Sequence, residues 1–260
     1  MKKAVKLLLS AALLSGLSAC SAERGTLKTV QRSGKIIIGL EGNWQPWSYH
    51  DESDTLVGYD VEVGKAIAEK LGVEAEFIEG PWDGLFAGID SGRYDIIING
   101  VGVTEERQKS YSFSDPYAYD SSVLIVLEGN EDVKTFEDLA GKKTANSIGS
   151  TYMELGEACG ATVEGVDSLT ETLDMVKQGR VDATINARTS FYDYMKYNPD
   201  DPFVITDESE DLTSIAIPMR GNDSSKELKE AINEAIRQLR EEGKLTELSV
   251  KYFGSDISVK

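Results

Sequence analysis

The sequence contains little of what enzymes use to build metal or nucleophilic centres. Its 260 residues include two cysteines and one histidine, and these residues are not grouped with the spacing of a zinc site. A glycine-rich phosphate-binding loop and the Gly-x-Ser-x-Gly motif of serine hydrolases are also absent from the sequence. We therefore expect no catalytic residue, no metal and no cofactor.

Positive charge is scarce as well, with 27 lysine and arginine residues against 45 aspartate and glutamate residues. The formal net charge of −18 favours solubility and repels a phosphate backbone, so we expect no nucleic-acid partner. The apolar run from Leu7 to Leu17 falls short of the roughly 20 residues that a membrane-spanning helix needs.

The N-terminal residues have the layout of a secretory signal peptide. Lysines at positions 2, 3 and 6 precede the apolar run, and the small residues Ser18 and Ala19 follow it. The segment 17–20 (Leu-Ser-Ala-Cys) resembles the bacterial lipobox, which implies removal of residues 1–19 and a membrane lipid anchor on Cys20. Residues 20–27 would then form a lipidated tether, and Cys159 could form no disulfide within the chain. An ordinary signal peptide with an incidental cysteine is the alternative.

From residue 35 onward, segments with the patterns of strands and helices alternate. The segment 59–71 places Val63, Ile67 and Leu71 on one helical face and ends at Gly72. Such alternation predicts an α/β fold, with helices on both faces of a sheet and a ligand site outside the carboxyl ends of the strands. The expected strands are 35–40, 73–78, 95–98, 123–127, 142–147, 161–166, 181–186, 203–206 and 214–218; the expected helices are 59–71, 82–89, 151–158, one after Ser168, 188–196, one from Ser225 and one ending at 252–254.

The segment 99–107 carries the sharpest local signal. A buried strand runs into Gly100 and Gly102, Thr104 is placed to cap a helix, and Arg107 falls in the first helical turn. A cation is unfavourable there, because a helix N-terminus is already positive. Glycine amides and a guanidinium would together form a receptor for a carboxylate. A surface arginine paired with one of the two preceding glutamates is the alternative.

The segment 101–117, with its Thr-Glu-Glu-Arg-Gln and Phe-Ser-Asp-Pro-Tyr motifs, resembles the bacterial amino-acid-binding proteins of solute-binding family 3. This resemblance implies a type II periplasmic-binding-protein-like fold, in which two α/β lobes joined by a two-strand hinge close on a ligand. Lobe 1 would comprise residues 28–118 and 214–260, lobe 2 residues 123–210, and the hinge residues 119–122 and 211–213. Further matches lie at 58–63, 82–85, 91–95, 179–183 and 252–254.

The resemblance also implies a set of binding residues. The carboxylate-binding arginine of the family falls on Arg107, helped by the amide of Gly102, and the carbonyl of Gly100 would accept the ligand's ammonium. From lobe 2, Ser150 and Thr151 would offer hydroxyl and amide groups at a helix N-terminus to the same carboxylate.

Two aromatic walls of the side-chain pocket fall on Trp44 and Trp82. Their indole faces would cover apolar or cationic parts of a ligand. Both residues could instead be core aromatics, but Trp44 lies in a polar loop and Trp82 begins a helix after a proline, so we favour the pocket.

One position departs from the family pattern. Members usually place an aspartate after the strand that corresponds to 181–186, where it binds the α-ammonium, and this sequence has Ala187. An ammonium without a partner in a closed cleft would cost about 2–5 kcal/mol. Either Asn186 or Glu41 takes over this role, or the ligand is not a plain α-amino acid.

The segments 183–186 and 191–196 look most like the cystine-binding branch of the family, so cystine is the first ligand that we expect. The resemblance implies a monomer that delivers its ligand to the permease and ATPase subunits of an ABC importer. An enzyme of the same fold, such as a dehydratase that uses Glu41 as an acid, and a ligand-sensing receptor domain are the alternatives.

Overall fold

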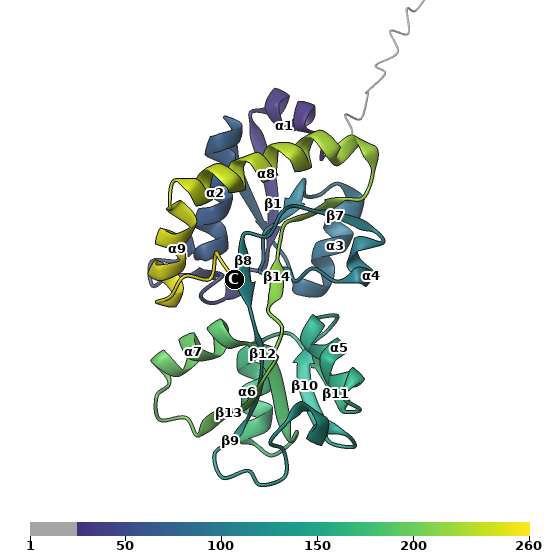
Figure 1. Cartoon of the computed structure of the whole chain (residues 1–260), viewed down its shortest axis with the longest axis vertical. Coiled ribbons are helices and arrows are strands. Elements are labelled where there is room, and N and C mark those ends of the chain that lie inside the picture. The colour runs from purple at the N-terminus through teal and green to yellow at the C-terminus, as the bar shows by residue number, and fades with distance from the viewer. Residues whose placement is uncertain (1–24) are drawn as a thin grey trace, which may run out of the picture.

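The computed structural model describes residues 25–260 (Figure 1). The expected signal peptide and the lipidated Cys20 lie outside the described residues. Two bodies stacked along the long axis of the molecule each contain a sheet covered by helices (Figure 1). This architecture confirms the expected two-lobed α/β fold, whereas the predicted lobe boundaries stay a prediction.

The first lobe is built on β1 (Lys35–Leu40), which pairs in parallel with β5 (Glu74–Glu79) and β6 (Ile96–Ile97). Side chains of β1 alternate between two cores, because successive residues of a strand point to opposite faces. Ile36 and Ile38 pack in the core formed with α2 and the C-terminal helices, and Ile37 packs in the core formed with α3. The helices of this lobe are α1 (Leu27–Ser33), α2 (Tyr59–Leu71), α3 (Trp82–Ser91), α4 (Glu105–Gln108), α8 (Lys226–Glu241) and α9 (Lys244–Phe253).

The second lobe has a five-stranded sheet in the order β11-β10-β12-β9-β13. β9 runs antiparallel to both of its neighbours and alternates in the same way as β1. Val123 and Ile125 pack with α6 and α7, while Leu124 and Val126 face the core on the α5 side. The elements are β9 (Ser122–Leu127), β10 (Lys143–Ser147), α5 (Thr151–Ala158), β11 (Thr162–Val166), α6 (Leu169–Lys177), β12 (Ala183–Ala187), α7 (Arg188–Tyr197), β13 (Phe203–Glu208) and the 3₁₀ helix Phe136–Leu139.

Two antiparallel strands, β8 (Ala118–Asp120) and β14 (Thr213–Ile215), run along the junction between the lobes (Figure 1). The strand expected at 214–218 is therefore interrupted. β14 pairs with β8, whereas β15 (Pro218–Arg220) pairs with β7 (Tyr111–Phe113). Between the two pairings, the hydroxyl of Ser114 accepts a hydrogen bond from the Ile217 amide.

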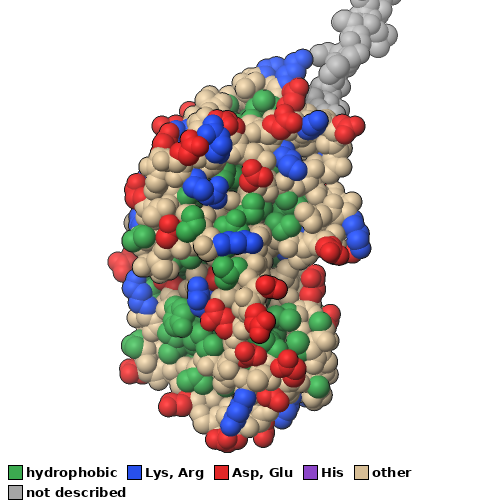
Figure 2. Space-filling model, viewed as in Figure 1, with side chains coloured by type: hydrophobic (Ala, Val, Ile, Leu, Met, Phe, Trp, Pro, Cys, Tyr) green, Lys and Arg blue, Asp and Glu red, His purple; other side chains and the backbone are tan. Residues whose placement is uncertain are grey.

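A small sheet of β2 (Asn43–Trp44), β3 (Ser48–His50) and β4 (Leu56–Val57) was not expected, because strands of two or three residues show no alternation. Among residues 25–260, no helix is both long and apolar enough to span a membrane. Acidic side chains are spread over both lobes on the face in Figure 2, as the net charge predicts.

Candidate functional site

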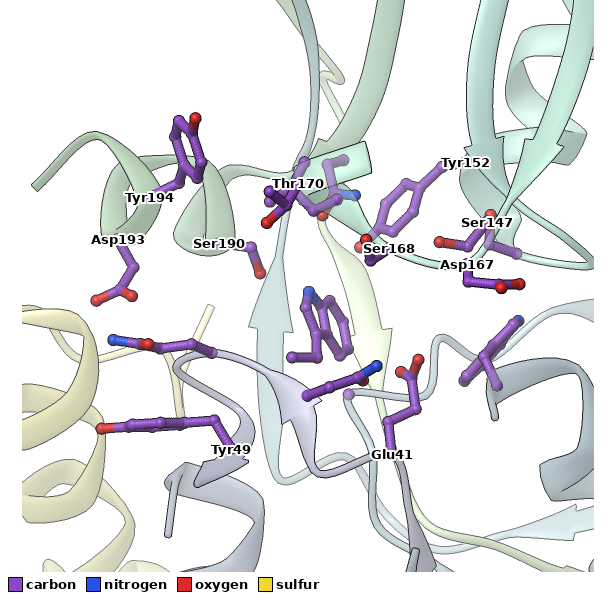
Figure 3. A pocket seen from close by; sticks show the side chains of 18 of the residues that line it. Glu41, Tyr49, Ser147, Tyr152, Asp167, Ser168, Thr170, Ser190, Asp193 and Tyr194 are labelled. Atoms are coloured by element: carbon purple, nitrogen blue, oxygen red, sulfur yellow. The ribbon is translucent and has the colours of Figure 1, made fainter. Parts of the chain in front are cut away.

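A cavity of about 480 Å³ is lined by residues of both lobes. One wall comes from the loop after β1, from Trp82 and from the segment around Gly100; the other comes from the N-terminus of α5, the loop before α6, and α7 (Figure 3). The structure brings all nine expected binding residues to this cavity. They are Glu41, Trp44, Trp82, Gly100, Gly102, Arg107, Ser150, Thr151 and Asn186.

Arg107 presents its guanidinium to the cavity between the lobes. The hydroxyl of Thr104 accepts a hydrogen bond from the Arg107 amide at 3.1 Å, which is the predicted cap of α4. Nη1 of Arg107 donates to the carbonyl of Gly102 at 2.9 Å, and Nη2 donates to the carbonyl of Gly149 in the other lobe at 3.2 Å. The guanidinium also lies over the ring of Trp82, 5.3 Å from its centroid.

Within residues 25–260, no acidic side chain forms an ion pair with Arg107; Glu106 pairs with Lys109 instead. The alternative, in which Arg107 forms a surface ion pair with Glu105 or Glu106, is therefore not observed in the structure. Burial lowers the pKa of the Arg107 guanidinium, because water is partly excluded from it. The group nevertheless stays protonated at pH 7, since an arginine side chain is always charged in that range. Glu154 acts on this charge without forming an ion pair, so the guanidinium gives the cavity a place for an anion.

Gly100 is held by a buried carboxylate that sequence reasoning did not identify as part of the site. Oδ2 of Asp60 accepts a hydrogen bond from the Gly100 amide at 2.6 Å, and Oδ1 accepts one from the hydroxyl of Tyr117 at 2.7 Å. Asp60 is fully buried, and burial raises its pKa to about 7, against the effect of both hydrogen bonds. Asp60 fixes the peptide at Gly100, whose carbonyl is the predicted acceptor for the ligand's ammonium.

Replacing Gly100 with alanine is expected to lower both stability and ligand affinity. Gly100 has a φ of 54°, and an added Cβ would lie 2.6 Å from Cζ3 of Trp44, so the indole would have to move. The left-handed backbone alone costs an alanine about 1–2 kcal/mol. Gly129→Ala is the matched control, because Gly129 has a φ of 82° and no atom within 4 Å of the added Cβ. Thermal melting should show a loss of stability in both variants, larger in Gly100→Ala, and calorimetric titration should show weaker binding only in Gly100→Ala.

The two tryptophans are backed by further aromatic rings. Trp44 stacks on the buried Trp47, with ring centroids 5.5 Å apart and planes 21° from parallel. Trp82 meets Phe86 edge to face at 6.0 Å. Both tryptophans are themselves only partly buried and line the cavity. Their positions therefore match the expected pocket walls, held in place by rings behind them.

The lobe 2 wall presents the N-terminus of α5. Ser150 is the N-cap residue, and its hydroxyl oxygen accepts a hydrogen bond from the Met153 amide at 3.1 Å. The hydroxyl proton of Ser150 stays available to a ligand, as does the positive end of the helix dipole at Thr151. This end of α5 also approaches Arg107 through the Gly149 carbonyl, so both lobes direct positive charge toward one part of the cavity.

The structure favours one of the two residues that could bind the ligand's ammonium in place of the aspartate expected at position 187. Oδ1 of Asn186 accepts a hydrogen bond from the Ala187 amide at 2.9 Å, which leaves the donating amino group of this side chain unpaired. The oxygen of Asn186 is already engaged and the side chain carries no negative charge, so Asn186 is a weaker partner for an ammonium than a carboxylate. Glu41 is the better acceptor: its carboxylate points into the cavity (Figure 3), and one oxygen accepts a hydrogen bond from Asn99 at 2.7 Å.

Glu41 has an unusual protonation equilibrium. It follows the last residue of β1, at the carboxyl end of the strand, where the sheet pattern predicts a ligand site. Burial raises its pKa to about 7, and the hydrogen bond from Asn99 opposes this shift. A cation that approaches a buried carboxyl group of this kind stabilises its ionised form and lowers its pKa.

Several residues that line the cavity were not expected from the sequence. Most of those on lobe 2 have polar or aromatic side chains, and four of them follow helical spacing along α7, a polar stripe that the sequence does display. They are Ser147, Tyr152, Asp167, Ser168, Leu169, Thr170, Ser190, Asp193, Tyr194, Tyr197 and Asn198 on lobe 2, with Gly42, Asn43, Gln45, Tyr49 and His50 on lobe 1. Within residues 25–260, no group of three potential metal ligands is clustered.

Known proteins resemble the chain over almost its whole length. It is 36% identical to the L-cystine-binding protein TcyA of Bacillus subtilis (strain 168), over 99% of this chain and all of that protein. Among solved structures, an ancestral arginine-binding protein bound to glutamine matches with a TM-score of 0.79 and 36% identity, covering 85% of this chain and 99% of that one. The L-cystine solute receptor of Neisseria gonorrhoeae in the unliganded open conformation matches with a TM-score of 0.62 and 36% identity, covering 90% and 99%. The model for bacterial extracellular solute-binding proteins, family 3, matches residues 36–255, and the chain belongs to this family.

Proposed function

We propose that this protein is the extracytoplasmic substrate-binding component of an ABC importer, that it binds a polar amino acid or related solute in the cavity between its lobes, and that cystine is its first candidate ligand. The observation that carries the proposal is the half-buried, unpaired guanidinium of Arg107 in a cavity lined by both lobes. Permease and ATPase subunits would be its partners. A Haemophilus influenzae relative that is 37% identical over 97% of this chain, a probable amino-acid ABC transporter-binding protein, supports this.

The geometry explains how capture would work. A ligand carboxylate would accept hydrogen bonds from the guanidinium of Arg107 in lobe 1 and from the Ser150 hydroxyl and the Thr151 amide in lobe 2. One ligand group would thus bind to both lobes. Closure around the ligand would exclude water and strengthen each of these charge interactions. The hydrogen bond from Arg107 to the Gly149 carbonyl of the other lobe agrees with lobes that already stand close together.

Cystine is favoured by the relatives, and the cavity is large enough for a small molecule. The cavity volume of about 480 Å³ falls within the range of about 300–1,000 Å³ that is typical of small-molecule sites. The names of TcyA and of the Neisseria receptor both specify cystine. Cystine also carries a carboxylate and an ammonium at each end, which suits a cavity with both Arg107 and Glu41.

A thermal-shift screen tests this function. Ligands that bind the folded state raise the melting temperature by mass action, so the screen should include cystine, cysteine, the polar amino acids and small carboxylates. We expect a rise with cystine or another polar amino acid and none with simple carboxylates. A screen in which no amino acid stabilises the protein would contradict the proposal.

An enzyme of the same fold is the second candidate, because the Glu41 pKa of about 7 also suits a general acid. Prolonged incubation of the protein with each compound that binds, followed by chromatography, distinguishes the two functions. A binding protein returns the compound unchanged, whereas a dehydratase-like enzyme would convert it.

The lipid anchor is also part of the proposal. Cys20→Ser is expected to release the protein from the membrane fraction, because a lipid chain at Cys20 would be the attachment. Cys159→Ser is the control: Cys159 lies partly buried beside the core on the α5 side and should not affect fractionation. Membrane association that survives in Cys20→Ser would contradict the anchor.

A further inference from the structure

We propose that the cavity-lining face of α7 forms a second charged subsite, in which Asp193 binds a cationic group at the end of the ligand away from the carboxylate held by Arg107. This inference rests on the proposed function and specifies its ligand class. The ligand would be an amino acid with a second cationic group, such as a second ammonium or a guanidinium.

Four residues of α7 form the face in question. Ser190, Asp193, Tyr194 and Tyr197 are spaced by three, four and seven residues, which places them on one side of a helix. All four line the cavity. In Figure 3, Asp193 and Tyr194 lie on one side of the cavity, and Ser147 and Asp167 lie on the other. The helix thus presents hydroxyl, carboxylate and phenol groups to the ligand space.

Ser190 supplies evidence that this face is built for a ligand. Its side chain is 1% exposed, and its hydroxyl has no hydrogen-bond partner among the described residues. A buried hydroxyl without a partner costs about 1–3 kcal/mol, so such groups are uncommon in a folded protein unless they serve a purpose. A polar ligand beside α7 would give Ser190 the partner that it lacks.

Asp193 is a partly buried carboxylate that forms no ion pair among residues 25–260. Burial raises its pKa, and this shift is opposed by the charge of Lys196 on the same helix and by a hydrogen bond from Gln45 of the opposite lobe. A desolvated carboxylate of this kind attracts a cation strongly once the lobes close.

Asp193 and Arg107 occupy separate parts of the cavity. Arg107 is held between the Gly102 and Gly149 carbonyls against Trp82, whereas Asp193 lies beside Gln45 and near Tyr49. The two groups do not contact each other and share none of these neighbours. This arrangement favours a ligand that carries a charge at each end.

The charge of the whole cavity points to the same ligand class. Three carboxylates line it, those of Glu41, Asp167 and Asp193, against the single guanidinium of Arg107. His50 also lines it, but its ring is hydrogen-bonded to Glu79. An amino acid with one ammonium would compensate only one of the three acids, and an acidic amino acid would add to the repulsion. The dibasic amino acids bring two cationic groups and one carboxylate. Cystine also brings two cationic groups but has a second carboxylate, so the charge of the cavity favours the dibasic amino acids more strongly.

The test compares Asp193→Asn with Asp200→Asn, the same substitution at an exposed residue seven positions along the chain and outside the cavity. Calorimetric titration would use L-cystine and L-arginine, with S-methylcysteine and L-glutamine as analogues that lack the second cationic group. For whichever of cystine or arginine the wild-type protein binds, we expect Asp193→Asn to weaken affinity about tenfold or more and Asp200→Asn to leave it unchanged. The two analogues should bind weakly and equally to all three proteins.

Retained affinity in Asp193→Asn, or a wild-type preference for glutamine or S-methylcysteine, would overturn the subsite while leaving the proposed function intact. A wild-type protein that binds none of the four compounds and no other amino acid would overturn both. Ser190→Ala provides an independent check, since it should weaken the same ligand several-fold without changing the protein's charge. Melting temperatures of the unliganded variants establish that each is folded.

Discussion

Arg107→Ala is expected to weaken ligand binding about a hundredfold or more while changing the melting temperature of the unliganded protein little. The loss follows from removing one partner of a desolvated charge pair, which typically costs about 2–5 kcal/mol. Stability should be kept, because the carbonyls of Gly102 and Gly149 that Arg107 contacts line or border an open cavity and can bind water instead. Isothermal titration with the screened ligand and melting without it measure the two effects separately.

Two further variants make this result specific. Arg180→Ala is the matched control, since Arg180 is an exposed arginine paired with Glu164 on the surface and should bind ligand normally. Arg107→Lys keeps the charge but loses the bidentate fork, so its affinity should lie between that of the wild type and that of Arg107→Ala. Undiminished affinity in Arg107→Ala would show that the carboxylate does not bind at this residue.

Ligand affinity is expected to fall as the pH drops below about 7. In the unliganded protein, Glu41 has a pKa of about 7, and a ligand ammonium beside it would lower that pKa. Below pH 7, binding must therefore expel a proton, so the affinity should decrease by up to about tenfold per pH unit. Above about pH 8, Glu41 is already ionised and the affinity should be constant. Titrations at several pH values between 5.5 and 8.5 measure this dependence.

Glu41→Gln should bind more weakly at pH 8 and lose the pH dependence. His50 also lines the cavity, and its hydrogen bond to Glu79 raises its pKa, so His50→Gln is the control and should keep the slope of the wild type. An affinity that rises on acidification, or a slope that persists in Glu41→Gln, would contradict the pairing of Glu41 with the ammonium.

The contribution of Glu41 to the stability of the unliganded protein should decrease as the pH rises, whereas ligand affinity should increase. The pKa of Glu41 is raised from 4.5 in the unfolded chain to about 7 in the folded one, so the folded state binds the proton more tightly. The resulting stability is complete below pH 4.5 and is lost as the pH rises through 7. Glu41→Gln should accordingly melt above the wild type at pH 8. The residue that would favour the ligand is thus one that disfavours the empty fold.

Local patterns sufficed to predict the fold class and several elements. The helices 59–71 and 151–158 have the expected bounds, because apolar spacing, an N-cap serine at 150 and a terminal glycine at 72 all act within a few residues. The strands β2 to β4 carry no such pattern, since their register depends on pairing with each other rather than on a buried face.

The residues of the candidate site were likewise predictable only where the signal is local in the sequence. Arg107 and Gly100 were predictable because a strand end, glycines and a cap stand within nine residues of each other. The support that Asp60 gives to Gly100 was not, because the two residues are 40 positions apart and meet only through the fold. Asp193 also escaped prediction, since a polar stripe on a helix usually faces solvent and nothing local distinguishes one that faces a cavity.

The discontinuous first lobe has a consequence for the order in which the chain acquires structure during synthesis. Its core joins Val30 and Ile36 to Leu239 and Leu248, which lie on the last two helices. The other lobe draws its core from the uninterrupted stretch between β9 and β13. The second lobe can therefore be completed first. The core of the first lobe stays uncovered where α8 and α9 will pack until the end of the chain emerges. The apolar strands near the N-terminus therefore stay partly uncovered until the C-terminal helices are in place. Apolar surface that is exposed in this way promotes aggregation.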